Sequence, residues 1–324
     1  MAGQRPAVRQ RTGRHRPDQR RTHQHRGVHQ MSTVAVIGLG IMGLPMATNL
    51  CKAGHDVIGF NRSQGRIDRL VANGGRGATS VADAVRDADV IITMLPDSPD
   101  VESVAGGEDG LIANAKSGAI WVDASTIRPD VAIRLAQAAS ARGIRPVDAP
   151  VSGGEQGAIE AALSIMVGGE AADVEAARPV LEAVGSTIVH VGPSGSGQTV
   201  KAANQLIVAG TIQLVAEALV FLEAHEVDTE SAIRVLAGGL AGNRILDRKA
   251  AAMAARTFEP GFRVDLHHKD LGIVTAAARE AGVAIPLGAM TAQLMGALRA
   301  QGHGSLDHSA LLLLVEQLSG RSRD

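Results

Sequence analysis

The chain has 324 residues, 45% hydrophobic and 20% charged, which is enough for a sizeable core and too long for a single compact domain to be expected. Only 2% of the residues are aromatic, with no Tyr and one Trp, so the stacking platforms that hold single-stranded nucleic acid are excluded and no nucleic-acid partner is expected. A lone cysteine excludes an internal disulfide and fits a cytoplasmic location, and no uninterrupted apolar stretch approaches the roughly 20 residues of a membrane span.

Residues 1–30 differ in character from the rest of the chain. Eight Arg and one Asp give them a net charge of +7, which leaves −8 for the remainder of a chain whose total is −1. With almost no apolar side chains they cannot offset the entropy lost on ordering, so we expect a disordered basic tail. An arm for nucleic acid or a membrane surface, an organelle transit peptide, and translated sequence ahead of a start at Met31 are the alternatives. We favour the last, because the segment is neither Ser-rich nor amphipathic.

The first element that we expect is a buried parallel strand over Thr33 to Ile37, a β-branched apolar run that leads directly into the stretch GLGIMG. Gly38 permits a tight turn, Gly40 lets backbone approach a pyrophosphate, and Gly43 allows close packing of the next helix on the strand. That helix should run from about Ile41 to Ala53, with the pyrophosphate at its N-terminus. The predicted cofactor-binding residues here are Gly38, Leu39, Gly40, Ile41, Met42 and Gly43.

A second strand is expected over Asp56 to Phe60, and its end is where the ribose of the dinucleotide should lie. An acidic residue there would accept hydrogen bonds from the 2′-hydroxyl of NAD, but the chain has Asn61, Arg62 and Ser63. These side chains offer donors, and Arg62 can form a forked pair with a 2′-phosphate. We therefore predict a preference for NADP, with NAD as the alternative and with Arg62 as a plain surface charge in that case.

Strands and helices continue to alternate along the chain, which is the pattern of a doubly wound sheet. We expect strands over Asp89 to Leu95 and Ala119 to Asp123, and a helix over Pro129 to Arg142. Leu95 and Pro96 lie at the carboxyl end of one of these strands, and Ser125 and Thr126 follow the other. Ligands of open α/β sheets bind at such ends. Further strands are expected at Arg145 to Asp148, Leu163 to Val167 and Thr187 to Val191, and residues 31–193 form the predicted Rossmann-type domain.

Beyond a glycine cluster that ends at Gly197, the sequence lacks the alternation typical of strands and predicts helices only. A stripe of apolar residues predicts a helix of about 29 residues, about 44 Å long, that ends near Ala224 and joins the first domain to an all-α domain over residues 194–324. The same helix carries Lys201 and Asn204, which are three residues apart and so share one face. The residues of the stripe are Val200, Ala203, Ile207, Leu214, Ala218 and Leu222.

Lys201 is the candidate acid/base. Hydride addition to an aldehyde creates an alkoxide, which needs a proton donor within hydrogen-bond reach. A free Lys titrates near pH 10.4, so a cleft that partly excludes water has to lower its pKa for work at neutral pH. Taken alone, a Lys in the first turns of a helix is more often a surface charge.

Five stretches taken together resemble the β-hydroxyacid dehydrogenase family, over nearly all of the chain from Met31 to Leu318. The resemblance implies a Rossmann-type domain followed by a helical domain, and NAD(P)H-dependent reduction of a small carboxylated semialdehyde. It also implies a homodimer or homotetramer that assembles through the helical domain, which suits the apolar run Leu311 to Val315, although that run can equally be a core helix. The stretches are GLGIMGLPMATNL (38–50), DVIITMLPDSPDV (89–101), DAPVSGG (148–154), GSGQTVKAANQ (195–205) and HHKDL (267–271).

Carried over residue by residue, the resemblance implies that Lys201 is the catalytic acid/base and that Asn204 supports it. It places Ser125 beside both the nicotinamide and the substrate, lets Lys269 close over the cofactor, and leaves Asp270 to an internal ion pair. His267 and His268 are neighbours on a helix and so point in different directions, and we expect no metal. The substrate carboxylate is implied to bind at Ser152, Gly153 and Gly154, where small residues expose backbone N–H groups.

Within the family, three further stretches most resemble members that reduce tartronate semialdehyde to glycerate: residues 238–250, 258–271 and 306–318. Enzymes acting on 3-hydroxyisobutyrate, glyoxylate or succinic semialdehyde are the nearest alternatives, because they share the chemistry and differ in pocket side chains. A non-catalytic reader of nucleic acid is a remote alternative that the basic tail suggests. Such relatives lack the lysine, and so do most imine-reducing relatives, so Lys201 argues against both.

Overall fold

A computed structural model describes residues 31–321, and the predicted basic tail over residues 1–30 lies outside this range. The core of the N-terminal part is a sheet in the order β3-β2-β1-β4-β5-β6-β8-β7, with β9 paired to β8. The first six strands in this order pair in parallel. They are β1 (Thr33–Ile37), β2 (Asp56–Phe60), β3 (Arg76–Gly77), β4 (Val90–Thr93), β5 (Ile120–Asp123) and β6 (Arg145–Asp148).

The far edge of the sheet departs from the parallel pattern. β8 (Leu163–Gly169) pairs antiparallel with both β6 and β7 (Val151–Ser152), and it pairs in parallel with β9 (Gly185–Gly192). The predicted strands β1, β2 and β6 match the structure residue for residue, and the others differ by a few residues at their ends. The two-residue strands β3 and β7 were not predicted, because so short a run carries no periodic signal.

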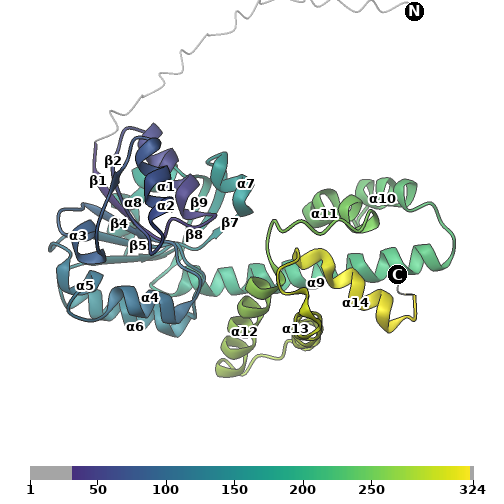
Figure 1. Ribbon diagram of the computed structural model, residues 1–324. Helices are drawn as coiled ribbons and strands as arrows, with labels where there is room; N and C mark the ends of the chain where they lie inside the picture. Colours follow the sequence, from purple (N-terminus) through teal and green to yellow (C-terminus); the bar gives the residue numbers. More distant parts are fainter. Residues whose placement is uncertain (1–30, 322–324) are drawn as a thin grey trace, which may run out of the picture. The chain divides into compact units, whose positions relative to one another are not determined.

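Helices cover both faces of the sheet, as Figure 1 shows. Alternate residues of β1 supply both layers: Val34 and Val36 face one core, while Ala35 and Ile37 face the other. The first layer contains α1 (Gly43–Lys52), α2 (Gln64–Ala72), α7 (Gly154–Ile159) and α8 (Ala171–Glu182). The second contains α3 (Val81–Val85), α4 (Ser98–Ala105), α5 (Leu111–Asn114) and α6 (Pro129–Ser140).

The rest of the described chain is helical, so the predicted fold class is confirmed. A single helix, α9 (Ser196–Ala224), follows the sheet and packs against α11, α12, α13 and α14. Its buried residues contribute to two apolar clusters, one built with α12 and α13 and the other with α11. The remaining helices are α10 (Thr229–Gly238), α11 (Arg244–Ala254), α12 (Val264–Glu280), α13 (Pro286–Leu298) and α14 (Leu311–Leu318).

Two details of the helical part correct the sequence analysis. The stripe that predicted α9 does not face the core: Ile207 is 68% exposed and Leu214 is 62% exposed. The buried side of α9 instead includes Ala209, Ile212 and Ala216, small or β-branched side chains that allow the neighbouring helices to approach closely. The apolar run in α14 is largely buried, so it is a core helix and does not form a free assembly surface.

Helix α9 is long and apolar enough to cross a membrane by length and composition alone, contrary to the expectation that no stretch would qualify. The sequence of α9 contains no unbroken apolar run of that length, because polar residues such as Lys201, Gln205 and Gln213 interrupt it. These three side chains are buried against other parts of the protein. Helix α9 is therefore packed as the central helix of the C-terminal part.

Candidate active site

The turn between β1 and α1 is shaped by the two outer glycines of the motif. Gly38 has a φ of +100°, and a Cβ there would lie 2.3 Å from the Met94 carbonyl oxygen. A Cβ on Gly43 would lie 1.9 Å from the Gly38 carbonyl oxygen. At Gly40, by contrast, a Cβ would meet no atom within 4 Å, so the backbone faces open space.

This open space lies at the start of α1, whose first turn contains no acidic side chain. The unpaired N–H groups of a helix N-terminus attract anions, and a bare glycine allows an anion to approach the backbone. The turn therefore fits the pyrophosphate of a dinucleotide. Helix α1 begins two residues later than expected, at Gly43, since the preceding residues form the turn itself.

At the end of β2, Asn61 supports the glycine turn. Its Oδ1 accepts a hydrogen bond from the Leu39 backbone N–H at 3.0 Å, and its Nδ2 donates to the Ser63 carbonyl at 3.4 Å. The two following side chains, Arg62 and Ser63, are exposed. The donors predicted to face a 2′-phosphate are therefore on the surface next to the turn, while the amide of Asn61 is engaged by the protein.

The carboxyl ends of β4 and β5 are tied together by Ser125. Its side chain is fully buried, and its Oγ accepts a hydrogen bond from the Leu95 backbone N–H at 2.9 Å. The Ser125 backbone N–H donates to Asp123 Oδ1 at 3.1 Å, and burial raises the pKa of Asp123 to about 6. The hydroxyl of Ser125 thus holds the loop in place, a role that was not predicted from the sequence. Pro96, which follows Leu95, is exposed.

Lys201 is buried, with 7% of its surface exposed, in the second turn of α9. Its Nζ donates to the Val151 carbonyl oxygen at 2.7 Å and to Gln205 Oε1 at 3.1 Å. Val151 immediately precedes Ser152, so the ammonium lies beside the segment Ser152–Gly154. In that segment Gly153 and Gly154 have φ values of +141° and +67°, which only glycine adopts readily.

The environment of Lys201 lowers the pKa of its amine to about 8. Burial is the main cause, because a desolvated ammonium loses the stabilisation that water provides. The negative charge of Asp270 acts in the opposite direction, and the positive charge of Lys269 lowers the pKa further. A pKa near the physiological range suits a group that gives and takes a proton.

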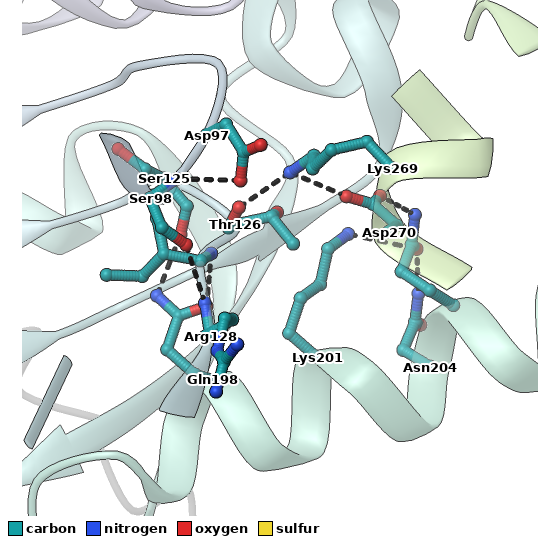
Figure 2. Close-up of polar contacts among 12 residues, drawn as sticks. Asp97, Ser98, Ser125, Thr126, Arg128, Gln198, Lys201, Asn204, Lys269 and Asp270 are labelled. Carbon is teal, nitrogen blue, oxygen red and sulfur yellow. Dashed lines mark hydrogen bonds and ion pairs between the residues drawn. The ribbon is translucent and has the colours of Figure 1, made fainter. Parts of the chain in front are cut away.

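Gln205 belongs to this site, and the sequence analysis missed it. Its Oε1 accepts hydrogen bonds from Lys201 and from Asn204 Nδ2, the latter at 2.8 Å, and its Nε2 donates to Asp270 Oδ2 at 2.5 Å. Figure 2 shows the three partners Lys201, Asn204 and Asp270 around it. Because the carboxylate can only accept, the orientation of the Gln205 amide is fixed. The spacing of four residues from Lys201 would have pointed to it.

Lys269 of α12 contacts the loop after β5. Its Nζ donates to the Thr126 carbonyl oxygen at 2.6 Å and lies 2.7 Å from Asp270 Oδ1, so Asp270 has a neighbouring cation as expected (Figure 2). A cleft of about 490 Å³ lies between α4, α6 and α12, and Lys269 forms part of its wall.

Behind Gln205, the two histidines of the HHKDL stretch have different surroundings. His267 is fully buried, its Nε2 lies 3.2 Å from the Gln205 carbonyl oxygen, and its Nδ1 lies 2.8 Å from Nδ1 of His308. A carbonyl can only accept, so Nε2 of His267 carries the proton and His308 donates to Nδ1. His268 points elsewhere, against Gly296 of α13. Burial lowers the pKa of both His267 and His308.

Comparison with known proteins agrees with this arrangement. Residues 33–192 match the family model described as the NAD binding domain of 6-phosphogluconate dehydrogenase. Residues 195–315 match the model described as NAD-binding of NADP-dependent 3-hydroxyisobutyrate dehydrogenase. The chain is 41% identical to 2-hydroxy-3-oxopropionate reductase of Escherichia coli, over 87% of this chain and 97% of that protein. It is 38% identical to an NAD-dependent L-serine dehydrogenase of Pseudomonas aeruginosa, over 90% of this chain and 100% of that protein.

Among solved structures, 3-hydroxyisobutyrate dehydrogenase of Mycobacterium tuberculosis with L-serine superposes with a TM-score of 0.80 at 36% identity, covering 87% of this chain and 98% of that one. The similarity thus extends over both parts of the chain, and it includes the glycine turn and the helix that carries Lys201. The chain belongs to the β-hydroxyacid dehydrogenase family and is an NAD(P)-dependent dehydrogenase that acts on a CH–OH group.

Proposed function

We propose that the protein reduces tartronate semialdehyde to glycerate with NADPH, and that Lys201 is the catalytic acid. The observation that carries the proposal is the buried Lys201 ammonium beside the segment Ser152–Gly154. Similarity to the E. coli reductase over nearly its whole length supports this substrate. We also propose that residues 31–193 form the dinucleotide-binding domain, that residues 194–324 form the helical domain, and that the protein is located in the cytoplasm.

In this mechanism the nicotinamide, when bound, supplies the hydride to the carbonyl carbon. Lys201 gives a proton from Nζ to the carbonyl oxygen. An ammonium has three N–H donors. Within residues 31–321, two of them bind the Val151 carbonyl and Gln205 Oε1, so the third is left for the substrate oxygen. The backbone N–H groups of Ser152, Gly153 and Gly154 would hold the carboxylate, and Asn204 and Gln205 keep the amine in place.

The pH dependence tests the role of Lys201 in both directions. Reduction needs the ammonium, so kcat for the aldehyde should fall as the pH rises through about 8. Oxidation of the alcohol needs the neutral amine and should rise over the same range. The measurement is kcat in each direction from pH 6 to 10, and a reduction rate that stays level through pH 9 would contradict the assignment.

The preference for NADPH is proposed from Arg62 and Ser63, which are exposed next to the glycine turn. The similarity to an NAD-dependent relative makes NADH the alternative. Arg62→Ala should raise KM for NADPH by about 10-fold or more, since one charge-assisted phosphate contact contributes about 1.5–3 kcal/mol. KM for NADH should change by less than about twofold, and an equal effect on both cofactors would contradict a contact between Arg62 and the 2′-phosphate.

The substrate is tested by a panel of small semialdehydes and alcohols. We expect tartronate semialdehyde to give a higher kcat/KM than glyoxylate, succinic semialdehyde or methylmalonate semialdehyde. L-serine and 3-hydroxyisobutyrate are the specific rivals, because proteins named for them align with this chain over nearly its full length. If either is oxidised with a kcat/KM above that for glycerate, the substrate assignment fails while the chemistry of Lys201 stands.

Assembly into a homodimer or homotetramer is proposed from the exposed face of α9. Val200, Ile207, Leu214 and Phe221 recur every seven residues, or about two helical turns, and are 37%, 68%, 62% and 63% exposed. Such a continuous apolar stripe on an exposed helix is typical of an interface. Leu214→Asp should shift the sedimentation coefficient towards that of the monomer, whereas Val71→Asp, on exposed α2, should not.

A further inference from the structure

The side chain of Gln198, in the first turn of α9, is bonded to the backbone of the loop after β5. Its Oε1 accepts from the Ile127 N–H at 3.1 Å. Its Nε2 donates to the Ser125 carbonyl oxygen at 2.8 Å (Figure 2). Only 1% of its surface is exposed. Because Ile127 offers only a donor and Ser125 only an acceptor, the amide fits in a single orientation.

The part of α9 that carries Gln198 is itself fixed on the sheet. The Gln198 backbone N–H donates to Asp148 Oδ2 at 3.0 Å, and the Gly195 N–H donates to Asp148 Oδ1 at 2.7 Å. A Cβ on Gly197 would lie 2.4 Å from the Met166 carbonyl oxygen, so this turn lies directly on β8. Both ends of the Gln198 side chain are therefore anchored.

Gln198 and Lys201 are three residues apart on the same helix and share its buried face. The loop that Gln198 holds is the one that contains Ser125 and whose Thr126 carbonyl accepts from Lys269. A single side chain thus links the helix bearing the amine to the strand end at which ligands of such sheets bind.

We infer that Gln198 is a positioning residue, which keeps the loop 125–127 in register with Lys201 and so aligns the substrate carbonyl with the proton donor. The inference rests on the proposed function. Without the amide, one buried N–H and one buried carbonyl of the loop lose their partners, and the loop is free to move relative to α9. Misplacement of reacting groups by about 1 Å costs about 100-fold in rate.

The decisive variant is Gln198→Glu, because it makes the link depend on pH. A carboxyl group accepts from Ile127 in either form, but only its protonated form donates to Ser125. Burial and the neighbouring Asp148 should raise the pKa of the introduced carboxyl. We expect kcat of this variant, divided by wild-type kcat at the same pH, to be within about threefold of unity near pH 6 and to fall about 10-fold or more by pH 8.

Gln198→Ala should lower kcat by about 10- to 100-fold at every pH, with KM for the semialdehyde within about threefold of wild type. Gln213→Ala is the matched control, as Gln213 is also buried on α9 but bonds to Glu217, and its kcat should equal that of the wild type. A Gln198→Glu ratio that does not vary with pH, or a Gln198→Ala kcat within twofold of wild type, overturns the inference.

Amide hydrogen exchange gives a readout that needs no substrate, so it separates this inference from the proposed function. The Ile127 N–H should lose protection in Gln198→Ala and keep it in Gln198→Glu. Equal protection in the two variants would refute the positioning role. If instead the wild type reduces no semialdehyde while the exchange pattern is as expected, the proposed function fails and the structural link remains.

Discussion

The glycine turn of the sheet and the lysine turn of α9 are both parts of the candidate active site, yet they are built in different ways. Around Gly38 and Gly43 the backbone contacts itself, and the distances of 2.3 and 1.9 Å for an added Cβ show that no other residue fits there. Around Lys201 the contacts are side-chain hydrogen bonds, of which one stays within α9 and two reach segments 50 and 65 residues away in the chain. The first kind of site is specified by the close approach of backbone atoms and the second by side-chain hydrogen bonds.

If this contrast holds, removing the amine should abolish chemistry and leave the fold intact. Lys201→Met should lower kcat by about two to four decades. It should also raise the free energy of unfolding by about 1–3 kcal/mol near pH 7, because burial lowers the pKa of the amine from 10.5 to about 8 and keeping it charged in the fold costs stability. Stopped-flow or steady-state rates and urea denaturation measure the two effects, with Lys52→Met on exposed α1 surface as the control.

A rate close to the wild type in Lys201→Met would remove the lysine from the mechanism. A loss of stability together with the loss of rate would show that the ammonium is a structural part of the fold, and the contrast with the glycine turn would fail.

A matched pair of glycine variants tests the other half of the contrast. Gly43→Ala should destabilise the protein by about 2–4 kcal/mol, since its methyl group would overlap the Gly38 carbonyl. Gly40→Ala has open space around it and should unfold within about 1 kcal/mol of wild type, but its methyl group should weaken NADPH binding by about 10-fold. Thermal unfolding and cofactor titration distinguish them, and equal destabilisation by both would show that the steric argument is wrong.

The smallest effect is expected from the buried histidines behind the lysine turn. Burial lowers the pKa of His267 and His308 below the ordinary value of 6.5, so the unfolded chain takes up protons first as the pH falls. The two neutral histidines therefore contribute their full share to the free energy of unfolding above about pH 6.5. Below that pH the share should decrease, by up to about 1.4 kcal/mol per pH unit for each histidine. His308→Gln can still donate to His267 and should make this slope shallower between pH 5 and 7.

The measurement for this prediction is the free energy of unfolding in urea at each pH. His225→Gln, at the exposed end of α9, should keep the wild-type slope. If His308→Gln keeps it as well, the buried pair is not what makes the protein sensitive to acid.

The same contrast explains what the sequence could and could not predict. The strands β1, β2 and β6, the glycine turn and the length of α9 follow from local patterns, and the structure agrees with them. Gln198 was not singled out, because its partners Ser125 and Ile127 are remote in the chain. Gln205 has one remote partner, Asp270, but its spacing from Lys201 is a local signal that was overlooked. The face of α9 was also assigned wrongly, since its exposed stripe is as apolar as its buried side and periodicity alone does not distinguish them.

The cap that Asp148 places on α9 has a consequence for exchanging modules between relatives. The turns from Gly195 to Lys201 are bonded to the sheet through Asp148 and Val151, although they follow the last strand. In a chimaera joined at residue 193, the first turns of α9 would come from one relative, while Asp148 and Val151, to which they bond, would come from the other. A crossover placed beyond Gln205 would transfer the amine with its bonds to Val151 and Gln205, and the grafted helices would need to supply an acceptor in place of Asp270 for the Gln205 amide.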